Sequence, residues 1–511
     1  MVFSSHYFLF YFFTVFLLLY YVMVGLRVNL SWINLLITIA SYFFYGWFEP
    51  WFVTLMWIST FLDYAAGRAI EKPDQVLHAK PPYILDVINI FRYPYYITWW
   101  ISNALNMPVE RRRAYIRNIA LITSMVGNLG LLGFFKYYMF VMGGVNRLAE
   151  LTGGPNNLFQ ILSITLPIGI SFYTFQTMSY TIDVWRGDAP PVKDMRTFSC
   201  FVALFPQLIA GPIIRYNTVA EQLSYRKHTL SKFSSGLAIF ITGFAKKILL
   251  ANPGGMVADA IFNADSPDML SSWFGVLGYH FQIYFDFCGY SDMAVGLGRM
   301  MGFEFIKNFN APYRAQSMSD FWNRWHISLS TWIRDYLYIA LGGNRGSVGR
   351  TYFNLAIAMF LCGVWHGAKM TFIVWGVMHG ALLIWERTMG RKPVYHMLPP
   401  FAKIIVTNII VMFTWVAFRA SSMDQCFHVW KSMLGLLKPS PSAPLLRAEL
   451  FTANHMFEMA IIAFVCWQPV QAHEWVQKLT PTKAIWLALL LFLAVISMFT
   501  QSFNPFLYFQ F

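Results

Sequence analysis

Two histidines stand in polar blocks of an otherwise apolar chain, and both are candidates for moving a proton. His326 lies in the stretch 320–345, DFWNRWHISLSTWIRDYLYIALGGNR, and His366 lies in GVWHG at 363–367. An imidazole can take and return a proton near neutral pH, which few other side chains can do. Transfer of an acyl group to a hydroxyl or thiol needs such a base, because a neutral alcohol is a poor nucleophile. We therefore take His326 and His366 as candidate catalytic residues for acyl transfer.

The surroundings of the two histidines suggest that they share one buried site. They are 40 residues apart, a spacing that suits two neighbouring helices joined by a loop or turn. The glycines beside His366 let a substrate or another backbone approach closely. Further candidates for lining a substrate chamber are Asn323, Ser328, Trp365 and Asp286.

A structural role is the alternative for each of these polar residues. Either candidate histidine could be a hydrogen-bonded structural residue, and we expect this role for His379 in GVMHG. Asp320 with Arg324, and Arg334 with Asp335, are expected to form structural contacts. No HExxH or other ligand spacing is present in the sequence, so we expect no metal site.

The composition places these residues in a membrane protein. Of the 511 residues, 57% are hydrophobic and only 12% are charged, whereas soluble domains carry about a quarter charged residues. Long uncharged runs recur along the whole chain, and each run of about 18 residues or more predicts a spanning helix. The five cysteines are scattered and are expected to be buried apolar residues.

The net charge of +14 is carried largely by short loops between apolar runs. This pattern favours loops retained beside anionic lipid over nucleic-acid binding, for which no motif is present in the sequence. The first run, 1–24, has neither a basic start nor a cleavage site, so we expect it to be a retained span. Basic residues after the first and third runs predict that the N-terminus lies outside the cytoplasm.

We expect an all-α, polytopic membrane domain over 1–511 with roughly eleven to thirteen spans, some of them broken or re-entrant. The loop 71–113 is predicted to be a cytoplasmic insertion with an interfacial helix, 438–450 a loop, and 320–367 the catalytic core.

Pro167 and Gly169 should break a span near 159–180. Asp286 and Asp292 lie in one apolar run, where carboxylates are costly and normally functional, and Gly289 could mark a break between them. The remaining predicted spans lie near 30–47, 51–68, 116–135, 198–214, 235–250, 273–301, 352–366, 370–385, 404–418, 456–467 and 484–499.

Several of these blocks carry a specific resemblance. SYFFYGW, PIGISFYTFQTMSYTIDVWRG, FPQLIAGPIIRY, YFDFCGYSDMAVGLGRMMG, FWNRWHISLSTWIRDYLYIALGGNR, LCGVWHGA and the terminal FNPFLYFQF cover nearly the whole chain. In these blocks the sequence resembles the membrane-bound O-acyltransferase (MBOAT) family, in the bacterial branch that contains the alginate O-acetyltransferases. The insertion at 71–113 is longer than this pattern predicts, so the resemblance does not identify the partner proteins.

The resemblance implies helices around a catalytic chamber, with His366 matching the broad family's histidine and His326 that of the bacterial branch. It implies acetyl transfer from a cytoplasmic thioester such as acetyl-CoA, with no bound cofactor. The implied partners are membrane lipids and periplasmic proteins that acetylate an exopolysaccharide, and the implied location is the bacterial inner membrane. D-alanyl transfer to teichoic acid and peptidoglycan O-acetylation are alternatives of the same class. A transporter that moves a donor without chemistry is an alternative of another class, favoured by broken helices and opposed by the absence of an inverted repeat in the sequence.

Overall fold

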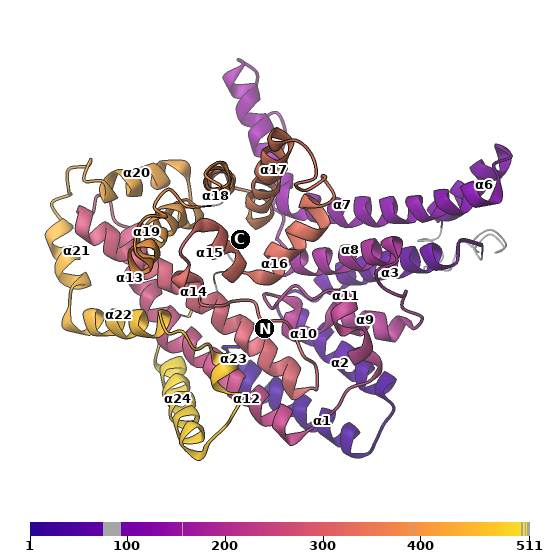
Figure 1. Ribbon diagram of the computed structural model, residues 1–511, viewed down its shortest axis with the longest axis horizontal. Coiled ribbons are helices and arrows are strands. Elements are labelled where there is room, and N and C mark those ends of the chain that lie inside the picture. The colour runs from indigo at the N-terminus through magenta and orange to yellow at the C-terminus, as the bar shows by residue number, and fades with distance from the viewer. Residues whose placement is uncertain (75–92, 156, 391, 502–503, 506, 508–511) are drawn as a thin grey trace. The chain divides into compact units, whose positions relative to one another are not determined.

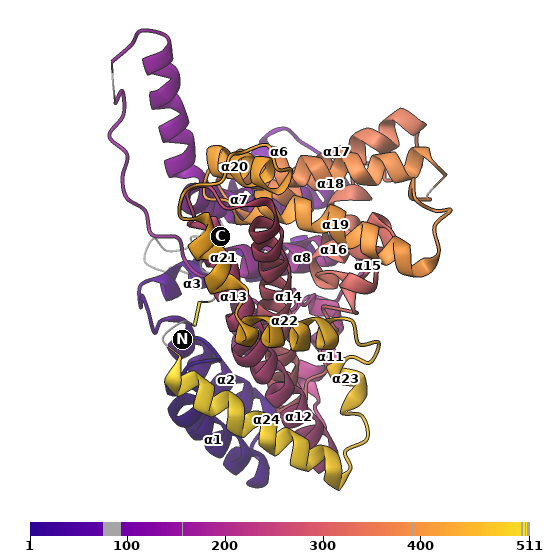
Figure 2. The same cartoon turned by 90° about the vertical axis from the view of Figure 1, so that its left-hand side faces the viewer.

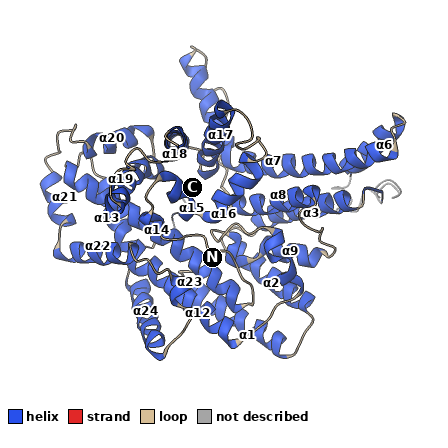
Figure 3. Cartoon of the chain, in the orientation of Figure 1, coloured by secondary structure: helices blue, strands red, loops and turns tan. Residues whose placement is uncertain are grey.

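The protein is helical throughout the part that the computed structural model describes, residues 1–74, 93–155, 157–390, 392–501, 504, 505 and 507. No strand occurs in these ranges (Figure 3), which confirms the all-α prediction. The chain divides into two compact units, the first made of Met1–Thr229 with Gly302–Phe305 and the second of Leu230–Met301 with Ile306–Phe511 (Figure 1). The single domain over 1–511 stays a prediction.

The first unit is organised around α3, which packs against both α7 and α8. This packing buries a carboxylate, Asp63, whose oxygens accept hydrogen bonds from Asn128 Nδ2 at 2.7 Å, from Thr181 Oγ1 at 2.8 Å and from Ser124. The buried acid is thus satisfied by neighbouring polar groups, as a low-dielectric interior requires. The helices of this unit are η1 (Tyr7–Phe12, π-helical), α1 (Phe13–Gly25), α2 (Leu30–Tyr45), α3 (Phe52–Glu71), α6 (Tyr93–Ala104), α7 (Val109–Leu151), α8 (Ile170–Arg186), α9 (Met195–Ala203), α10 (Phe205–Leu208) and α11 (Tyr216–Ser224).

Two predicted spans of this unit have different bounds in the structure. The break predicted at Pro167 and Gly169 is confirmed, because α8 begins only at Ile170, directly after the left-handed Gly169 (φ 77°). The part of the predicted span before this break, 159–166, is not helical. The run 198–214 is divided into α9 and α10 by Leu204, which precedes the Phe205-Pro206 start of α10. In the predicted insertion, residues 75–92 lie outside the described residues, and α6 and the start of α7 follow them.

The second unit contains both candidate histidines. Its longest helix, α14, is buried over most of its length and packs against α12 and α13. The helices are α12 (Leu230–Ala245), η2 (Lys246–Ala251, π-helical), α13 (Asn252–Phe262), α14 (Met269–Met300), η3 (Pro312–Arg314, 3-10), α15 (Met318–Arg324), α16 (Ile327–Trp332), η4 (Ile333–Tyr338, π-helical), α17 (Val348–His366), α18 (Met370–Thr388), α19 (Pro400–Arg419), α20 (Met423–Met433), α21 (Ala443–Leu450), α22 (Ala453–Cys466), α23 (Ala472–Trp475) and α24 (Pro481–Thr500).

A ladder of glycines joins α14 to the antiparallel run α12–η2–α13, which lies beside it in Figure 2. A Cβ on the α12–α13 member of each pair would lie 2.5–3.0 Å from the backbone oxygen of the glycine opposite, so only glycine permits this approach. The break predicted at Gly289 is therefore wrong, because α14 is continuous there and its glycine serves helix contact. The pairs are Gly236 with Gly296, Gly243 with Gly289, and Gly254 with Gly278.

The described helices confirm a multi-pass membrane protein. Six continuous helical segments are long and apolar enough to cross a bilayer, with η1–α1 and α12–η2–α13 each counted as one, or seven if the bent pair α21–α22 forms one span. Helix α14 falls outside this set because polar side chains such as Gln282 and Asp286 lower its hydropathy, and these side chains are buried by neighbouring helices. The count of eleven to thirteen spans stays a prediction, whereas the predicted loop at 438–450 is corrected by α21.

Candidate functional site

His326 occupies the sharp junction between α15 and α16. Helix α15 starts at the Ser317 cap, whose hydroxyl accepts from the Asp320 N–H, and ends before Trp325. His326 then takes a left-handed conformation (φ 43°, ψ 56°), which is strained for a residue with a Cβ and is often found at functional positions. The helix is interrupted at this residue, between the end of α15 at Arg324 and the start of α16 at Ile327. The side chain is 1% exposed.

Asn308 holds this junction in place from a preceding loop. Its backbone oxygen accepts from the Ile327 N–H at 2.9 Å. Its side-chain oxygen accepts from the Ser328 N–H at 3.1 Å and from Ser328 Oγ at 2.9 Å, and it lies 3.1 Å from His326 Nδ1. His326 Nε2 is buried and has no hydrogen-bond partner in the described part of the chain.

His366 is the last residue of α17, at the point where α17 packs closely against α18. A Cβ on Gly363 would lie 3.1 Å from the Cα of Gly376, so these glycines of GVWHG and α18 allow the two helices to touch. Aromatic rings enclose the imidazole, with Trp375 at 5.1 Å and Phe418 at 5.0 Å between centroids. His366 is 6% exposed and therefore buried like His326.

The indole of Trp365 links the two histidines. Its ring centroid lies 4.9 Å from that of His366 and 6.3 Å from that of His326. The two candidate histidines of the sequence therefore belong to one aromatic cluster of the second unit. Trp365, a candidate for lining the chamber, contacts both of them.

A small enclosed cavity of about 10 Å³ opens beside His366. This space is about the size of one water molecule, so an acetyl group enters only if the walls move. His326 does not line the cavity. Its imidazole contacts Phe287, which does, edge-on with 4.5 Å between the ring centroids. The cavity is lined by Ile283, Asp286, Phe287, Trp325, His366, Trp375, Trp415, Phe418 and Leu507.

Asp286 brings a carboxylate to the wall of this cavity and is held by two partners. Its Oδ1 lies 2.6 Å from Lys247 Nζ, and its Oδ2 accepts from the Leu507 N–H at 3.0 Å. Lys247 also donates to Asn252 Oδ1 at 3.0 Å and to the Pro505 carbonyl. The C-terminal residues Pro505 and Leu507 thus lie against the ion pair, and Leu507 against the cavity.

The other residues singled out in the sequence take different places. Ser328 is buried beside His326, whereas Asn323 is exposed and does not line the cavity, because Trp322 and Trp325 take the inward positions of this segment. The Asp320–Arg324 and Arg334–Asp335 ion pairs are confirmed as contacts along the chain, at 2.6 and 2.7 Å.

The structural role predicted for His379 is confirmed. Its Nδ1 accepts from Trp322 Nε1 at 3.2 Å, and its Nε2 lies 3.0 Å from Thr414 Oγ1. Both ring nitrogens are therefore occupied by protein groups, in contrast to the open Nε2 of His326.

Sequence reasoning missed Asn308, Lys247 and the aromatic wall made by Trp375, Trp415 and Phe418. Asn308 lies 18 residues before His326, in a loop whose only signal is its short polar segment KNFN. The tryptophans and phenylalanine resemble ordinary core residues in sequence, and only their convergence from α18 and α19 shows that they enclose His366.

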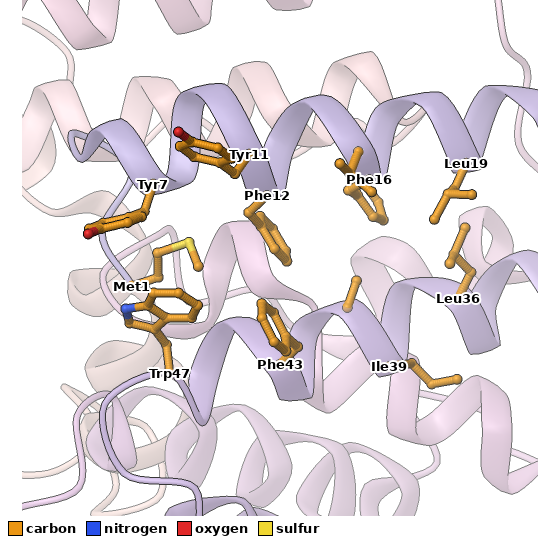
Figure 4. A pocket seen from close by; sticks show the side chains of 12 residues that line it. Met1, Tyr7, Tyr11, Phe12, Phe16, Leu19, Leu36, Ile39, Phe43 and Trp47 are labelled. Carbon is orange, nitrogen blue, oxygen red and sulfur yellow. The ribbon is translucent and has the colours of Figure 1, made fainter.

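A larger hollow of about 590 Å³ in the first unit is chemically different (Figure 4). It lies between η1–α1 and α2, and its side chains are apolar or aromatic, such as Tyr11, Phe12, Phe43 and Trp47. Because no histidine or carboxylate lines it, it lacks the groups that acyl transfer requires.

The chain is similar to known bacterial acyltransferases over most of its length. It is 43% identical to the probable alginate O-acetylase AlgI of Pseudomonas aeruginosa over 85% of this chain and 75% of that protein. It is 38% identical to the probable alginate O-acetylase AlgI of Azotobacter vinelandii over the full length of both. It is 34% identical to the peptidoglycan O-acetyltransferase of Helicobacter pylori over 65% of this chain and 68% of that protein.

The family profile described as MBOAT, membrane-bound O-acyltransferase family, matches residues 190–423. That segment contains His326, His366, Asn308 and Asp286, and therefore the polar part of the site just described. With relatives of this identity aligned over their full length, the chain is a member of the membrane-bound O-acyltransferase family and an acyltransferase enzyme.

Proposed function

We propose that the protein transfers acetyl groups for the O-acetylation of an exopolysaccharide, alginate or a similar polymer. The full-length identity to proteins named alginate O-acetylases supports this substrate class over peptidoglycan, since the peptidoglycan O-acetyltransferase aligns with only part of the chain. In this proposal the donor is acetyl-CoA or another acyl thioester on the cytoplasmic side, and no resident cofactor takes part.

The observation that carries the mechanism is the open Nε2 of His326. A buried nitrogen without a partner costs free energy, on the order of 1–3 kcal/mol, which a donating hydroxyl would recover. We assign His326 as the general base. Its Nε2 takes the proton of the acceptor hydroxyl as the oxygen attacks the acyl carbon. The new C–O bond replaces the C–S bond of the thioester, and the proton passes to the leaving thiolate.

His366 lines the cavity, and we assign it the role of binding the acyl group. From this position its ring can donate a hydrogen bond to the carbonyl oxygen, where negative charge develops as the hydroxyl oxygen adds. The aromatic walls around it exclude water, which strengthens this interaction and protects the thioester from hydrolysis. Asp286 lines the cavity and Trp365 contacts both histidines, and neither exchanges protons in this scheme.

The surroundings of the enzyme are part of the proposal. We place it in the bacterial inner membrane with the N-terminus in the periplasm, following the basic loops of the sequence. Periplasmic proteins would receive the acetyl group and complete polymer modification. Membrane lipids would cover the apolar groove of the first unit shown in Figure 4.

The test replaces each histidine and measures acetate on the polymer. His326→Ala and His366→Ala should each abolish polymer acetylation while the amount of membrane-inserted protein stays normal. His396→Ala is the matched control, because His396 is exposed and outside the site. Unchanged polymer acetate in both site variants would exclude this mechanism.

Two other functions remain as outcomes of a second measurement. Purified protein given a labelled acetyl thioester should lose the label from the donor and transfer it to an acceptor. Intact donor on the opposite side of a vesicle would instead indicate a transporter. Faster transfer from a D-alanyl thioester would favour teichoic-acid modification.

A further inference from the structure

We propose that Asn308 is a positioning residue that selects the tautomer of His326 and so keeps Nε2 free of a proton. The inference rests on the proposed role of His326 as general base. Asn308 does not line the cavity, so its effect would pass entirely through the imidazole.

The first step is the orientation of the Asn308 amide. A backbone N–H can only donate, and the Ser328 N–H lies 3.1 Å from Oδ1. The alternative orientation would place the amide NH₂ against this N–H, which would leave two donors facing each other. In this orientation the Ser328 hydroxyl, 2.9 Å away, also donates to the oxygen. The carbonyl oxygen of Asn308 is therefore the atom that faces the histidine.

The second step is the position of the ring proton. The Asn308 oxygen can only accept, and it lies 3.1 Å from His326 Nδ1. Nδ1 must then carry hydrogen to form this bond. Burial away from water favours the uncharged ring, and an uncharged imidazole with hydrogen on Nδ1 has its lone pair on Nε2. This is the form that can accept a proton from a substrate hydroxyl.

The third step is the rigidity of the arrangement. Two backbone hydrogen bonds join the loop to the junction, from the Ile327 N–H to the Asn308 oxygen at 2.9 Å and from the Asn310 N–H to the Arg324 oxygen at 3.0 Å. They fix the backbone of His326 in its left-handed conformation, so the ring is held with Nδ1 toward Asn308.

His379 shows that this selection is local and not a general feature of the unit. Its Nδ1 accepts from the Trp322 N–H, so its proton must lie on Nε2, which donates to Thr414. His379 and His326 thus carry their protons on opposite ring nitrogens. His280 in the same unit also leaves a buried nitrogen, Nδ1, without a partner among the described residues, but it does not lie at the cavity beside His366 or next to Asn308.

Among the groups around His326, Asn308 is the residue that determines which ring nitrogen carries the proton. The rings of Phe287 and Trp365 and the hydroxyl of Ser328 contact it, and none of them is charged. On the helices that supply these rings, α14 carries Asp286, which is paired with Lys247, and α17 carries His366.

Nitrogen NMR of the full-length protein, labelled with ¹⁵N-histidine in lipid nanodiscs, tests the proposal directly. The signals of His326 among the 11 histidines are identified by their loss in His326→Ala. We expect a protonated Nδ1 and an unprotonated Nε2 in the natural protein. In Asn308→Ala the proton should move to Nε2, the more common form of free neutral histidine, and the acyl-transfer rate should fall at least tenfold.

Asn308→Asp separates the tautomer from a purely structural role. Its carboxylate keeps an acceptor at the same position, so Nδ1 should stay protonated. The added charge favours the doubly protonated ring, so activity should be low at neutral pH and recover at alkaline pH. Asn354→Ala removes another buried amide, which donates to the Gly343 oxygen at 2.9 Å, and should leave both the tautomer and the rate unchanged.

Two results would overturn the inference. One is a proton on Nε2 of His326 in the natural protein. The other is full activity of Asn308→Ala with an unchanged nitrogen spectrum. Either can occur while His326→Ala is inactive, so failure of this inference is distinct from failure of the proposed function, which would require an active His326→Ala. If Asn308→Ala fails to fold, the spectrum of the natural protein and the alkaline recovery of Asn308→Asp still decide the question.

Discussion

Lys247 Nζ lies 2.6 Å from Asp286 Oδ1, and both side chains are almost completely buried, at 2% and 1% exposure. The pair joins η2 to α14 at the wall of the cavity that His366 lines. A carboxylate in an apolar run suggests function from sequence alone. Here the adjacent lysine gives Asp286 a structural role as well, because a buried charge requires a partner.

Replacement of Asp286 should therefore reduce stability. Asp286→Asn leaves the Lys247 ammonium buried without its counter-charge, for which a loss of about 3–5 kcal/mol is typical. We expect a lower thermal unfolding temperature in detergent and less protein in the membrane. The double variant Lys247→Met/Asp286→Leu removes both charges and should recover much of this loss.

The Arg334–Asp335 pair, in which Arg334 is exposed, provides the control for this comparison. Arg334 is 60% exposed, so Arg334→Gln should change the unfolding free energy by less than about 1 kcal/mol. Equal effects of Asp286→Asn and Arg334→Gln would contradict the buried pairing.

The glycine ladder predicts a second, purely steric effect. A Cβ on Gly289 would lie 2.7 Å from the Gly243 oxygen, so Gly289→Ala must force α12 and α14 apart. Overpacking of this kind typically costs about 1–3 kcal/mol. Gly349→Ala, where no atom lies within 4 Å, should instead be neutral or stabilising by roughly 0.5–1 kcal/mol, since alanine favours the helix. Thermal unfolding of the two variants measures the difference, and similar destabilisation by both would argue against the close approach.

The aromatic wall predicts the size of the acyl group that the chamber accepts. Phe287→Ala should enlarge the cavity beside His366 and raise the use of a propionyl thioester relative to an acetyl thioester by roughly tenfold, the usual effect of one methylene in a pocket. Competition between the two donors measures this ratio. Phe274→Ala lies on the same helix but packs on Phe451, outside the cavity, and should leave the ratio unchanged. A constant ratio in Phe287→Ala would show that Phe287 does not limit the acyl group.

The positions of many helices can be predicted from hydropathy. An apolar run bounded by polar residues forms a helix in a membrane, because few other structures satisfy its backbone hydrogen bonds there. Helix α17 was expected over 352–366 and spans Val348–His366, and α18 begins at the expected Met370. The errors occur where backbone geometry competes with hydropathy. The break at Pro167 and Gly169 was predicted, but the residues before it are not helical. Gly289 does not interrupt α14, because a glycine inside a packed helix can serve contact with its neighbour.

The site was only partly predictable for a similar reason. His326 and His366 stand out because they are polar residues in apolar surroundings. Asn308 does not stand out, since its role depends on a loop that folds back against the 326–328 backbone. Trp375 and Phe418 have the composition of any core residue, and only the packing of α18 and α19 directs them toward His366. Local patterns predict elements, whereas contacts between distant segments need the folded chain.

His326 and His379, which we assign opposite tautomers, predict opposite effects of the same substitution. His379→Phe keeps a ring of similar size but leaves the buried Trp322 N–H without its acceptor, so it should lower the unfolding free energy by about 1–3 kcal/mol. The Thr414 hydroxyl loses one contact but still donates to the Val411 oxygen at 2.8 Å. The protein that does fold should transfer acetyl groups at nearly the normal rate, because His379 does not line the cavity. His326→Phe removes Nε2, which has no partner in the described chain, and the Nδ1 contact to the Asn308 oxygen, which keeps the Ser328 N–H and hydroxyl as donors. The acyl-transfer rate should therefore collapse while stability falls less. Unfolding temperature and activity per folded molecule should be measured for both variants. If the assignment is correct, His379→Phe has the lower unfolding temperature and His326→Phe has the lower activity. If His379→Phe abolished activity in folded protein, the division between a structural and a catalytic histidine would not hold.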